Sequence, residues 1–285
     1  AKLEKFVEDC VARRSPRLMI TFPPRHGKSE QTSRKLPPFI LGHHPELEII
    51  LASYDISLAE QFSKHVIQIL KDERYQNLFP GTQLHPDDQA MSGWRTTAGG
   101  GFKPAGVGVG VTGMGAHVLI IDDPFKDRAE ADSDTVRNNT WDWYTDVAMT
   151  RLAPGGGILI INTRWHDDDL SGRLLAMMND EEQDQTHIDQ WDLVNFAAIA
   201  EDDEYLTPDY RLVTEPEEGA RLVRSAGDAL HPARYPTELL LRMKATMHPR
   251  SWNALYQQNP TPDSGIMFTK DLFRRYVHAP SRRGR

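Results

Sequence analysis

Arg17-Leu-Met-Ile-Thr-Phe-Pro-Pro-Arg-His-Gly-Lys-Ser29 is the stretch of this chain that decides its fold. The apolar run 18–22 predicts a buried strand, and the prolines and the glycine after it predict a turn. A Gly-Lys-Ser triplet then begins a segment that can be helical. A strand, a loop and a helix in this order bind phosphate, because N–H groups at the helix N-terminus face the oxyanions and the lysine reaches the terminal phosphates. The stretch therefore predicts a nucleotide-binding loop, although Phe22 stands where the full pattern has glycine.

A second motif ends another apolar run, Ala116-His-Val-Leu-Ile-Ile-Asp-Asp-Pro124. In nucleotide hydrolases with a phosphate loop, a strand-end carboxylate holds Mg²⁺ and a further residue orients the attacking water. Asp122 is therefore a predicted metal ligand together with Ser29, and Asp123 is a predicted catalytic residue. The alternative is a buried strand that ends in an ordinary Asp-Asp-Pro turn. Two strand-end motifs in the right order favour a hydrolase that uses ATP and Mg²⁺.

The composition is that of an ordinary globular protein. Of 285 residues, 39% are hydrophobic and 26% are charged, which suffices for a large α/β domain with a small second one. A single cysteine excludes an intramolecular disulfide and fits a reducing cytoplasm. The net charge of −8 argues against a protein that coats DNA. It does not exclude a local basic surface on the protein. No apolar run approaches the ~20 residues of a membrane span, so no membrane partner is expected.

Strand and helix signals alternate along the chain, which predicts an α/β fold with a mainly parallel central sheet flanked by helices. The predicted strands are 18–22, 48–53, 118–121, 158–161 and 193–199. The predicted helices are 28–41, interrupted at Pro37-Pro38, then 57–71, a helix capped by Ser133, 169–178 and 236–247. The glycine-rich stretch 80–116 predicts hairpins or loops. Acidic, proline-punctuated sequence beyond residue 200 predicts a small second subdomain.

Four motifs together resemble those of the large terminase subunits of tailed bacteriophages. They are Pro23-Pro-Arg-His-Gly-Lys-Ser29, Ile120-Ile-Asp-Asp-Pro124, Thr163-Arg-Trp-His166 and Leu255-Tyr-Gln-Gln-Asn-Pro260. The resemblance implies a RecA-like (ASCE-type) P-loop ATPase core over 1–200, a lid or linker subdomain over 201–262, and a linker over 263–285. In the family a nuclease domain follows, and its acid cluster is not found in this chain. We therefore expect an ATP hydrolase without nuclease activity.

The resemblance also implies partners for this ATPase. Such motors translocate double-stranded DNA into a procapsid as a ring, expected to be pentameric, on the portal protein. They work with a small terminase subunit in the host bacterial cytoplasm. One alternative is a helicase-like DNA-dependent ATPase, but a helicase usually carries a second RecA-like domain, for which the segment beyond residue 200 is too short. A second alternative is a catalytically idle nucleotide-binding module, which departures at Phe22, Asp123 and Met114 keep open.

Roles for single residues follow from the motifs and the resemblance. Lys28 is expected on the β- and γ-phosphates, and Arg25 matches a position from which an arginine can touch the γ-phosphate. Asp123 stands where many motor ATPases have glutamate, and Glu130 is the fallback. The full predicted nucleotide-binding stretch is Pro24, Arg25, His26, Gly27, Lys28, Ser29 and Glu30.

Two further expectations concern coupling between sites, and a third concerns an acidic cluster. Thr163 is expected to sense the γ-phosphate, and Arg164 and His166 to relay that signal. Relatives often carry an arginine where Met114 stands, and this arginine is a candidate for insertion into a neighbouring subunit's site. Arg95 and Arg151 are possible replacements between which the sequence does not choose. The cluster His166-Asp-Asp-Asp169 resembles a metal site, but we favour a helix N-terminus, whose dipole suits acids.

Overall fold

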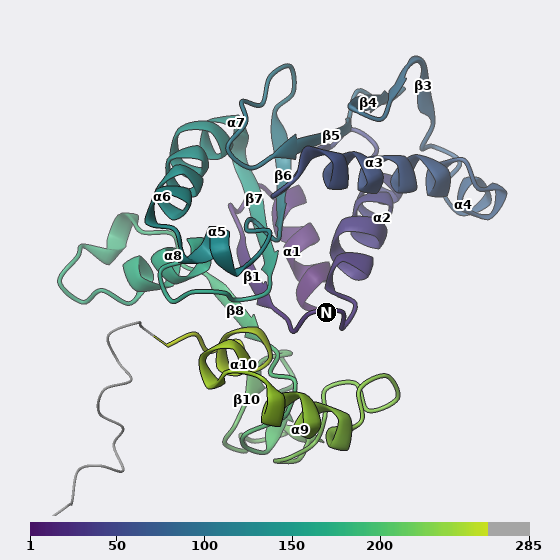
Figure 1. Ribbon diagram of the computed structural model, residues 1–285. Coiled ribbons are helices and arrows are strands. Elements are labelled where there is room, and N and C mark those ends of the chain that lie inside the picture. Colours follow the sequence, from purple (N-terminus) through teal and green to yellow (C-terminus); the bar gives the residue numbers. More distant parts are fainter. Residues whose placement is uncertain (262–285) are drawn as a thin grey trace, which may run out of the picture.

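The computed structural model describes residues 1–261, so the linker predicted over 263–285 lies outside the described residues. A large sheet forms its centre (Figure 1). The strands of this sheet are β1 (Arg17–Thr21), β2 (Glu48–Ser53), β3 (Leu84–Ala90), β4 (Gly93–Thr96), β5 (Gly101–Gly106), β6 (Ala116–Asp122), β7 (Leu152–Asn162) and β8 (Asp192–Asn195). Their spatial order is β3-β4-β5-β2-β6-β7-β1-β8. All neighbours from β5 to β8 are parallel, while β3 and β4 add an antiparallel edge, so the predicted mainly parallel sheet is confirmed.

Helices cover both faces of this sheet (Figure 1). They are α1 (Lys2–Val11), the π-helix η1 (Glu30–Lys35), α2 (Leu36–His43), α3 (Ile56–Leu70), α4 (Glu73–Leu78), α5 (Arg128–Asp132), α6 (Asp134–Trp143), η2 (Tyr144–Ala148), α7 (Met149–Arg151), α8 (Leu170–Met178) and η3 (Gln185–His187). Successive strand residues point to opposite faces. Leu18 and Ile20 therefore pack with α1, α2 and α3, whereas Met19 packs with α6 and α8. The layers are those that alternating strand and helix signals predict.

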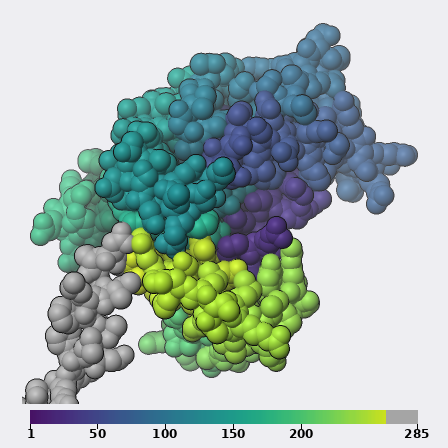
Figure 2. Space-filling model, viewed as in Figure 1, coloured from purple at the N-terminus to yellow at the C-terminus, as the bar shows by residue number. Residues whose placement is uncertain are grey.

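A smaller antiparallel sheet follows in the chain, with strands β9 (Glu204–Leu206), β10 (Leu212–Val213) and β11 (Arg221–Arg224) in the order β10-β9-β11. Two helices, α9 (Thr237–Thr246) and α10 (Pro249–Leu255), come after it. We call residues 197–261 the small-sheet region. Figure 2 shows it, in green to yellow, at one end of the molecule next to the purple N-terminal residues. The helix predicted over 236–247 is confirmed, but the three strands had not been predicted.

The hairpins predicted within 80–116 are confirmed, because β4 pairs antiparallel with both β3 and β5. No strand of the parallel sheet had been predicted in this stretch, and β5 is one. It pairs in parallel with β2 and lies inside the sheet, although glycine begins and ends it. A Cβ at Gly101 would lie 2.3 Å from the carbonyl oxygen of Trp94, and one at Gly100 would lie 2.4 Å from that of Leu47. Glycine is required here because backbones approach closely, and not because the chain turns.

The helix after the phosphate loop is continuous through Pro37-Pro38, contrary to the predicted interruption. The wide π turn of η1 precedes α2, so both prolines fall in the first turn of α2. Proline lacks a backbone N–H, and both prolines lie where the hydrogen-bond pattern of the helix changes from the π type of η1 to the α type of α2.

Two strands and one helix also differ from the predictions. β7 begins at Leu152 rather than 158, because Leu152 already pairs with Ala116 of β6. Its glycines hide this extension in the sequence, and glycine is needed at 157 because a Cβ there would lie 2.3 Å from Cys10 Sγ of α1. β8 ends at Asn195 rather than 199, because Ala198 N–H bonds to Tyr256 O in the small-sheet region, 2.6 Å away. Helix α1 has no predicted counterpart, although its buried residues fall on one helix face. Within residues 1–261, no helix is long and apolar enough to cross a membrane.

Candidate active site

The carboxyl ends of β6, β7 and β1 meet at one edge of the central sheet. The register pairs Asp122 with Ile161 and Thr21 with Asn162, so three strand ends lie level with one another. The phosphate loop, the Asp122-Asp123 pair and Thr163 leave these strands side by side. Ligands of parallel α/β sheets bind outside such carboxyl ends. The sheet therefore gathers motifs that lie far apart in the sequence.

The loop after β1 has the backbone of a phosphate cradle. Gly27 has a φ of +98° and Arg25 one of +59°, both in the left-handed region. An added Cβ at Gly27 would meet nothing within 4 Å, so glycine is needed there for its conformation and not for space. The helical segment begins at Lys28, which directs the free N–H groups of a helix N-terminus at the loop.

Lys28 and Asp123 form an ion pair at the centre of this edge. Lys28 Nζ lies 2.6 Å from Asp123 Oδ2, and the other carboxylate oxygen of Asp123 accepts the N–H of Thr163 at 2.9 Å. Asp123 has a φ of +46°, a conformation that aspartate tolerates better than most residues. The pair brings the predicted phosphate-binding cation and the predicted catalytic carboxylate into direct contact.

Asp122 is fully buried beside them and accepts two hydroxyl hydrogen bonds. Ser29 Oγ donates to its Oδ1 at 3.1 Å, and Ser33 Oγ donates to its Oδ2 at 2.5 Å. Burial, and next the nearby charge of Asp123, raise the pKa of Asp122 to about 6. Hydroxyl and carboxylate oxygens are the ligands that Mg²⁺ prefers, so Ser29 and Asp122 fit this ion. Ser33 had not been predicted, although it lies one helical turn after Ser29.

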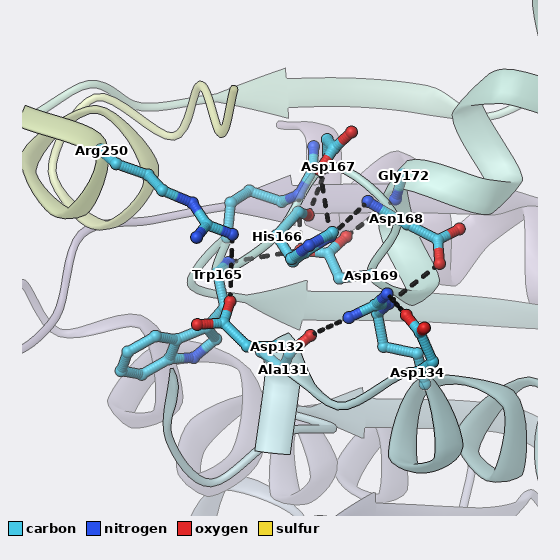
Figure 3. Close-up of polar contacts among 12 residues, drawn as sticks. Ala131, Asp132, Asp134, Trp165, His166, Asp167, Asp168, Asp169, Gly172 and Arg250 are labelled. Atoms are coloured by element: carbon cyan, nitrogen blue, oxygen red, sulfur yellow. Dashed lines mark hydrogen bonds and ion pairs between the residues drawn. The ribbon is translucent and has the colours of Figure 1, made fainter. Parts of the chain in front are cut away.

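Thr163 and Arg164 are buried between the strand ends and the small-sheet region. The hydroxyl of Thr163 donates to the carbonyl of Phe22 at 3.0 Å, which joins the predicted sensor to the start of the phosphate loop. The guanidinium of Arg164 bonds to Asp169 at 2.9 Å. Asp169 caps α8 by accepting from the N–H of Gly172 (Figure 3). The helix N-terminus predicted at His166–Asp169 is confirmed. Any relay through Arg164 has to use its backbone, because its side chain holds the cap.

His26 contacts the small-sheet region directly. Its ring stacks on Tyr235, with centroids 4.4 Å apart and planes 18° from parallel. Nδ1 donates to the carbonyl of Pro24 at 2.9 Å, and the buried Nε2 has no hydrogen-bond partner among the described residues. Burial lowers the pKa of His26, so its ring is neutral at physiological pH. A residue predicted only to line the phosphates thus also carries a contact between two parts of the molecule.

An apolar cavity of about 410 Å³ adjoins the phosphate loop. Gly27, Lys28 and Gln31 line its polar end. The rings of Phe22 and Phe196, 4.7 Å apart, belong to its apolar wall. The small-sheet region closes it with Leu206, Tyr210 and Leu212, and residues 1–3 complete it. None of these apolar residues had been predicted, since single apolar residues from distant segments carry no local signal.

The other predicted loop residues lie at the rim of the site. The side chain of Arg25 is exposed and has no hydrogen bond or ion pair within residues 1–261. Glu30 is exposed and pairs with Arg34 at 3.2 Å. Glu130, the alternative catalytic carboxylate, accepts from the N–H of Lys126 at 2.9 Å and so closes its own turn. Asp123 is therefore the carboxylate that the structure brings to Lys28.

The two candidate arginines for a neighbouring site lie at the opposite edge of the sheet, where β2, β5 and β6 begin. Arg95 lies 3.9 Å from Glu48 and 3.8 Å from Asp88, and its side chain is 43% exposed. Arg151 ends α7, immediately before β7 starts, and its Nε is buried without a partner among residues 1–261. Neither arginine lies at its own subunit's phosphate loop, as a residue acting on another subunit requires.

Comparisons with known proteins were made for sequence and for structure. A model of the family described as "Terminase large subunit, T4likevirus-type, N-terminal" matches residues 19–224. The ATPase domain of the large terminase of Thermus phage P74-26, in a mutant form, is 15% identical, with a TM-score of 0.50 over 91% of this chain and 98% of that chain. The same domain in another structure is 14% identical, with a TM-score of 0.48 and the same coverage.

A third structure, the large terminase of bacteriophage HK97, is 13% identical, with a TM-score of 0.41 over 69% of this chain and 39% of that chain. A search of curated protein sequences gave no significant match. The likeness to the Thermus phage ATPase domain extends to the fold, and the predicted RecA-like α/β fold is confirmed.

Proposed function

The chain belongs to the family of phage large terminase subunits, and we propose that it is the Mg²⁺-dependent ATPase of a motor that translocates double-stranded DNA into a procapsid. The observation that carries the proposal is the meeting of Lys28, Asp122 and Asp123 at one sheet edge, with Lys28 Nζ 2.6 Å from Asp123. Phosphoryl transfer to water requires a cation that binds the phosphates, a carboxylate that binds the metal and a base that activates water.

Different groups of the chain bind the phosphates, activate water and hold the metal ion. N–H groups of the loop and the N-terminus of its helix hold the β- and γ-phosphates, and Lys28 neutralises charge that grows on them in the transition state. When the γ-phosphate binds Lys28, the ion pair between Lys28 and Asp123 breaks. The Asp123 carboxylate then orients and deprotonates water. Ser29 and Asp122 would hold Mg²⁺, which supplies further positive charge to the phosphate oxygens. Arg25, exposed at the rim, reaches the γ-phosphate.

The apolar cavity beside the loop suits the adenine base. Its volume of about 410 Å³ and its aromatic wall of Phe22 and Phe196 match a planar, weakly polar ring system. The polar end with Lys28 and Gln31 leads to the phosphates. Because Leu206 and Leu212 of the small-sheet region also line the cavity, ATP would contact both parts of the molecule.

We propose an ATPase core over 1–200 and a lid subdomain over 201–262, so that the small-sheet region beyond residue 200 belongs to the lid. Thr163 is the γ-phosphate sensor, because it lies between Asp123 and Phe22. The partners would be double-stranded DNA, the portal protein, the small terminase subunit and further copies of this chain in a pentameric ring, all in the host bacterial cytoplasm. Arg95 or Arg151 would complete the neighbouring site.

Steady-state ATP hydrolysis at rising protein concentration tests this proposal. We expect Lys28→Ala to lower turnover by a factor of about 10²–10³, the usual effect of removing one group that stabilises transition-state charge. Lys35→Ala is the matched control, since Lys35 lies on the same helical segment, is exposed and pairs only with Glu30 at 3.6 Å within residues 1–261. Equal turnover in wild type and Lys28→Ala would overturn the proposal.

Mixing variants tests the ring and identifies the arginine. A Lys28→Ala subunit has a disabled site but intact Arg95 and Arg151. If one of these arginines acts on a neighbour, an inactive Arg→Ala variant at that position should regain turnover on mixing with Lys28→Ala, because the intact arginine then meets an intact site. No recovery for either arginine would exclude both of them as the residue acting between subunits.

A further inference from the structure

The turn that follows α10 contains two adjacent buried glutamines, Gln257 and Gln258, which are 7% and 4% exposed. Their amides reach different parts of the molecule. Gln257 bonds to both backbone groups of Ile199, at 3.3 and 3.0 Å, and to Glu201 at 3.0 Å, and so stays within the small-sheet region. Gln258 Oε1 accepts the N–H of Arg164 at 2.9 Å, at the carboxyl end of β7. Of the two, Gln258 therefore joins the small-sheet region to the sensor segment.

The other half of the Gln258 amide fixes its orientation. Nε2 donates to the carbonyl of Leu255, the last residue of α10, and Oε1 faces an N–H, so the two ends of the amide cannot be exchanged. The backbone of Gln258 has a φ of +57°, which is uncommon for a residue other than glycine. Such a conformation persists where surrounding contacts hold it, and here both amide ends are held.

Gln258 ends a chain of polar contacts that starts at the phosphate loop. Lys28 pairs with Asp123, and Asp123 accepts from the N–H of Thr163 at 2.9 Å. The next N–H along the chain, that of Arg164, bonds to Gln258. When a phosphate binds Lys28, Asp123 loses its ion pair and can turn toward water. This movement changes the hydrogen bond to the N–H of Thr163, and the N–H of the next residue, Arg164, is bonded to Gln258.

A second contact ties α10 to the same edge. Arg250 Nη2 bonds to Asp132 at 3.1 Å, and Asp132 ends α5, the helix that follows Asp122 and Asp123 (Figure 3). Figure 3 shows Arg250 reaching from α10 to Asp132 beside the 165–169 segment. Helix α10 thus contacts the end of α5 through Arg250, and the turn that follows α10 contacts the end of β7 through Gln258.

We propose that Gln258 is a positioning residue. It couples the hydrogen-bonded pair of Asp123 and Thr163 to α10, so that the nucleotide state at the phosphate loop sets the position of the small-sheet region. This inference rests on the proposed function, because it needs a nucleotide at Lys28. Gln258 itself does not touch the reacting atoms. Its amide transmits the nucleotide state because it makes one hydrogen bond to Arg164, at the end of β7, and one to Leu255, in the small-sheet region.

The test compares Gln258→Gly with Gln257→Ala. Glycine adopts the φ of +57° without strain, so this substitution removes the amide and keeps the backbone. Gln257→Ala removes a neighbouring amide of similar burial that does not reach β7. For each purified protein, hydrogen–deuterium exchange of residues 249–259 is measured with and without a slowly hydrolysed ATP analogue, alongside affinity for a fluorescent ATP analogue and steady-state turnover.

In wild type and in Gln257→Ala, nucleotide should change exchange in 249–259. In Gln258→Gly that change should be lost and turnover should fall by about tenfold, within the usual range of coupling between sites, while affinity stays within about threefold of wild type. A full nucleotide-dependent change in Gln258→Gly overturns the inference and leaves the proposed function intact. Absence of nucleotide binding in wild type overturns both.

A melting curve guards against loss of fold. If Gln258→Gly is unfolded, Gln258→Asn replaces it, because asparagine also tolerates a left-handed φ while its amide is one methylene too short to reach Arg164. It is judged by the same criteria: loss of the nucleotide-dependent change in 249–259 supports the inference, and a full change overturns it.

Discussion

The catalytic edge of the central sheet and the small-sheet region are built in different ways. At the edge, Lys28, Asp122 and Asp123 come from two short motifs at the ends of β1 and β6, which are buried on both faces. The small-sheet region has a core cluster of four buried hydrophobic residues: Ala198, Ala229, Leu240 and Trp252. It meets the edge through single residues such as Tyr235 and Gln258. The predicted catalytic residues thus lie beside a sheet that is buried on both faces, whereas the small-sheet region has a core of only a few residues.

The largest effect should come from the edge. Asp123→Asn keeps the shape of the side chain but removes the charge that pairs with Lys28 and the base that activates water. General base catalysis contributes a factor of about 10²–10⁴, so we expect turnover to fall by that factor with little change in ATP affinity. Single-turnover hydrolysis of labelled ATP measures it.

Glu130→Gln is the matched control for this prediction. The Glu130 carboxylate accepts from the N–H of Lys126, an interaction that the glutamine carbonyl can replace. Turnover should therefore stay within about twofold, since surface changes of this kind shift free energies by less than ~0.5 kcal/mol. A large loss in Glu130→Gln together with an active Asp123→Asn would move the catalytic role to α5.

The next effect should come from the core of the small-sheet region. Trp252 is 2% exposed, stacks on Tyr256 with centroids 4.9 Å apart, and is the largest member of its small cluster. Trp252→Ala should destabilise this region by about 3–5 kcal/mol, the usual cost of truncating a buried aromatic residue. With so few other buried residues, the region should open while the central sheet stays folded.

Limited proteolysis separates the two regions in this variant. New cleavage in 201–261 with an intact fragment covering the central sheet is the expected pattern. Tyr256→Phe, which keeps the stacked ring, should be cleaved like the wild type. Simultaneous loss of both regions in Trp252→Ala would show that they unfold as one cooperative unit.

The two regions also differ in how far the sequence predicts them. Four central strands, β1, β2, β6 and β7, carry apolar runs, and a parallel sheet buried on both faces produces such runs directly. β5 was missed because its glycines serve close backbone approach, with a Cβ at Gly101 only 2.3 Å from Trp94 O. The short strands β9–β11 show no alternation of buried and exposed residues, so no period marks them.

The candidate site shows the same division. Lys28, Ser29, Asp122, Asp123 and Thr163 were all named from sequence, because each motif is contiguous and stands at a strand end. Ser33 bonds to Asp122 at 2.5 Å, but a serine within a helix carries no signal of its own. The contacts of Tyr235 and Gln258 depend on how distant segments fold together, which one sequence does not reveal.

A third effect concerns the stability cost of the edge. Burial raises the pKa of Asp122 from 3.8 to about 6, so the ionised carboxylate destabilises the folded state. Below about pH 4 the group is protonated in both states. As pH rises from about 4 to 6, the unfolded state loses its proton first and wild type should lose ~3 kcal/mol. Asp122→Asn lacks this loss and should be more stable by up to that amount at pH 7.5.

Urea unfolding at pH 4 and pH 7.5, in the absence of divalent ions, measures this difference. The two proteins should be closer in stability at pH 4, and Asp122→Asn should unfold at higher urea at pH 7.5 while hydrolysing no ATP. Equal midpoints at pH 7.5 would mean that the two serine hydroxyls and Lys28 fully compensate the buried charge. Burying the ionised Asp122 carboxylate would then not lower the free energy of unfolding.

The smallest effect should come from the contact that joins the regions at the phosphate loop. Tyr235→Ala removes the ring stacked on His26, an interaction of about 0.5–1.5 kcal/mol, so KM for ATP should rise about twofold to tenfold with a smaller change in kcat. Because burial lowers the pKa of His26, exposing the ring should also raise that pKa toward its ordinary value, which NMR titration can follow. Tyr235→Phe keeps the stacked ring and should leave both quantities unchanged. If Tyr235→Ala raises the pKa of His26 but not KM, the loop keeps its shape without the small-sheet region, and Gln258 is the contact through which the two regions communicate.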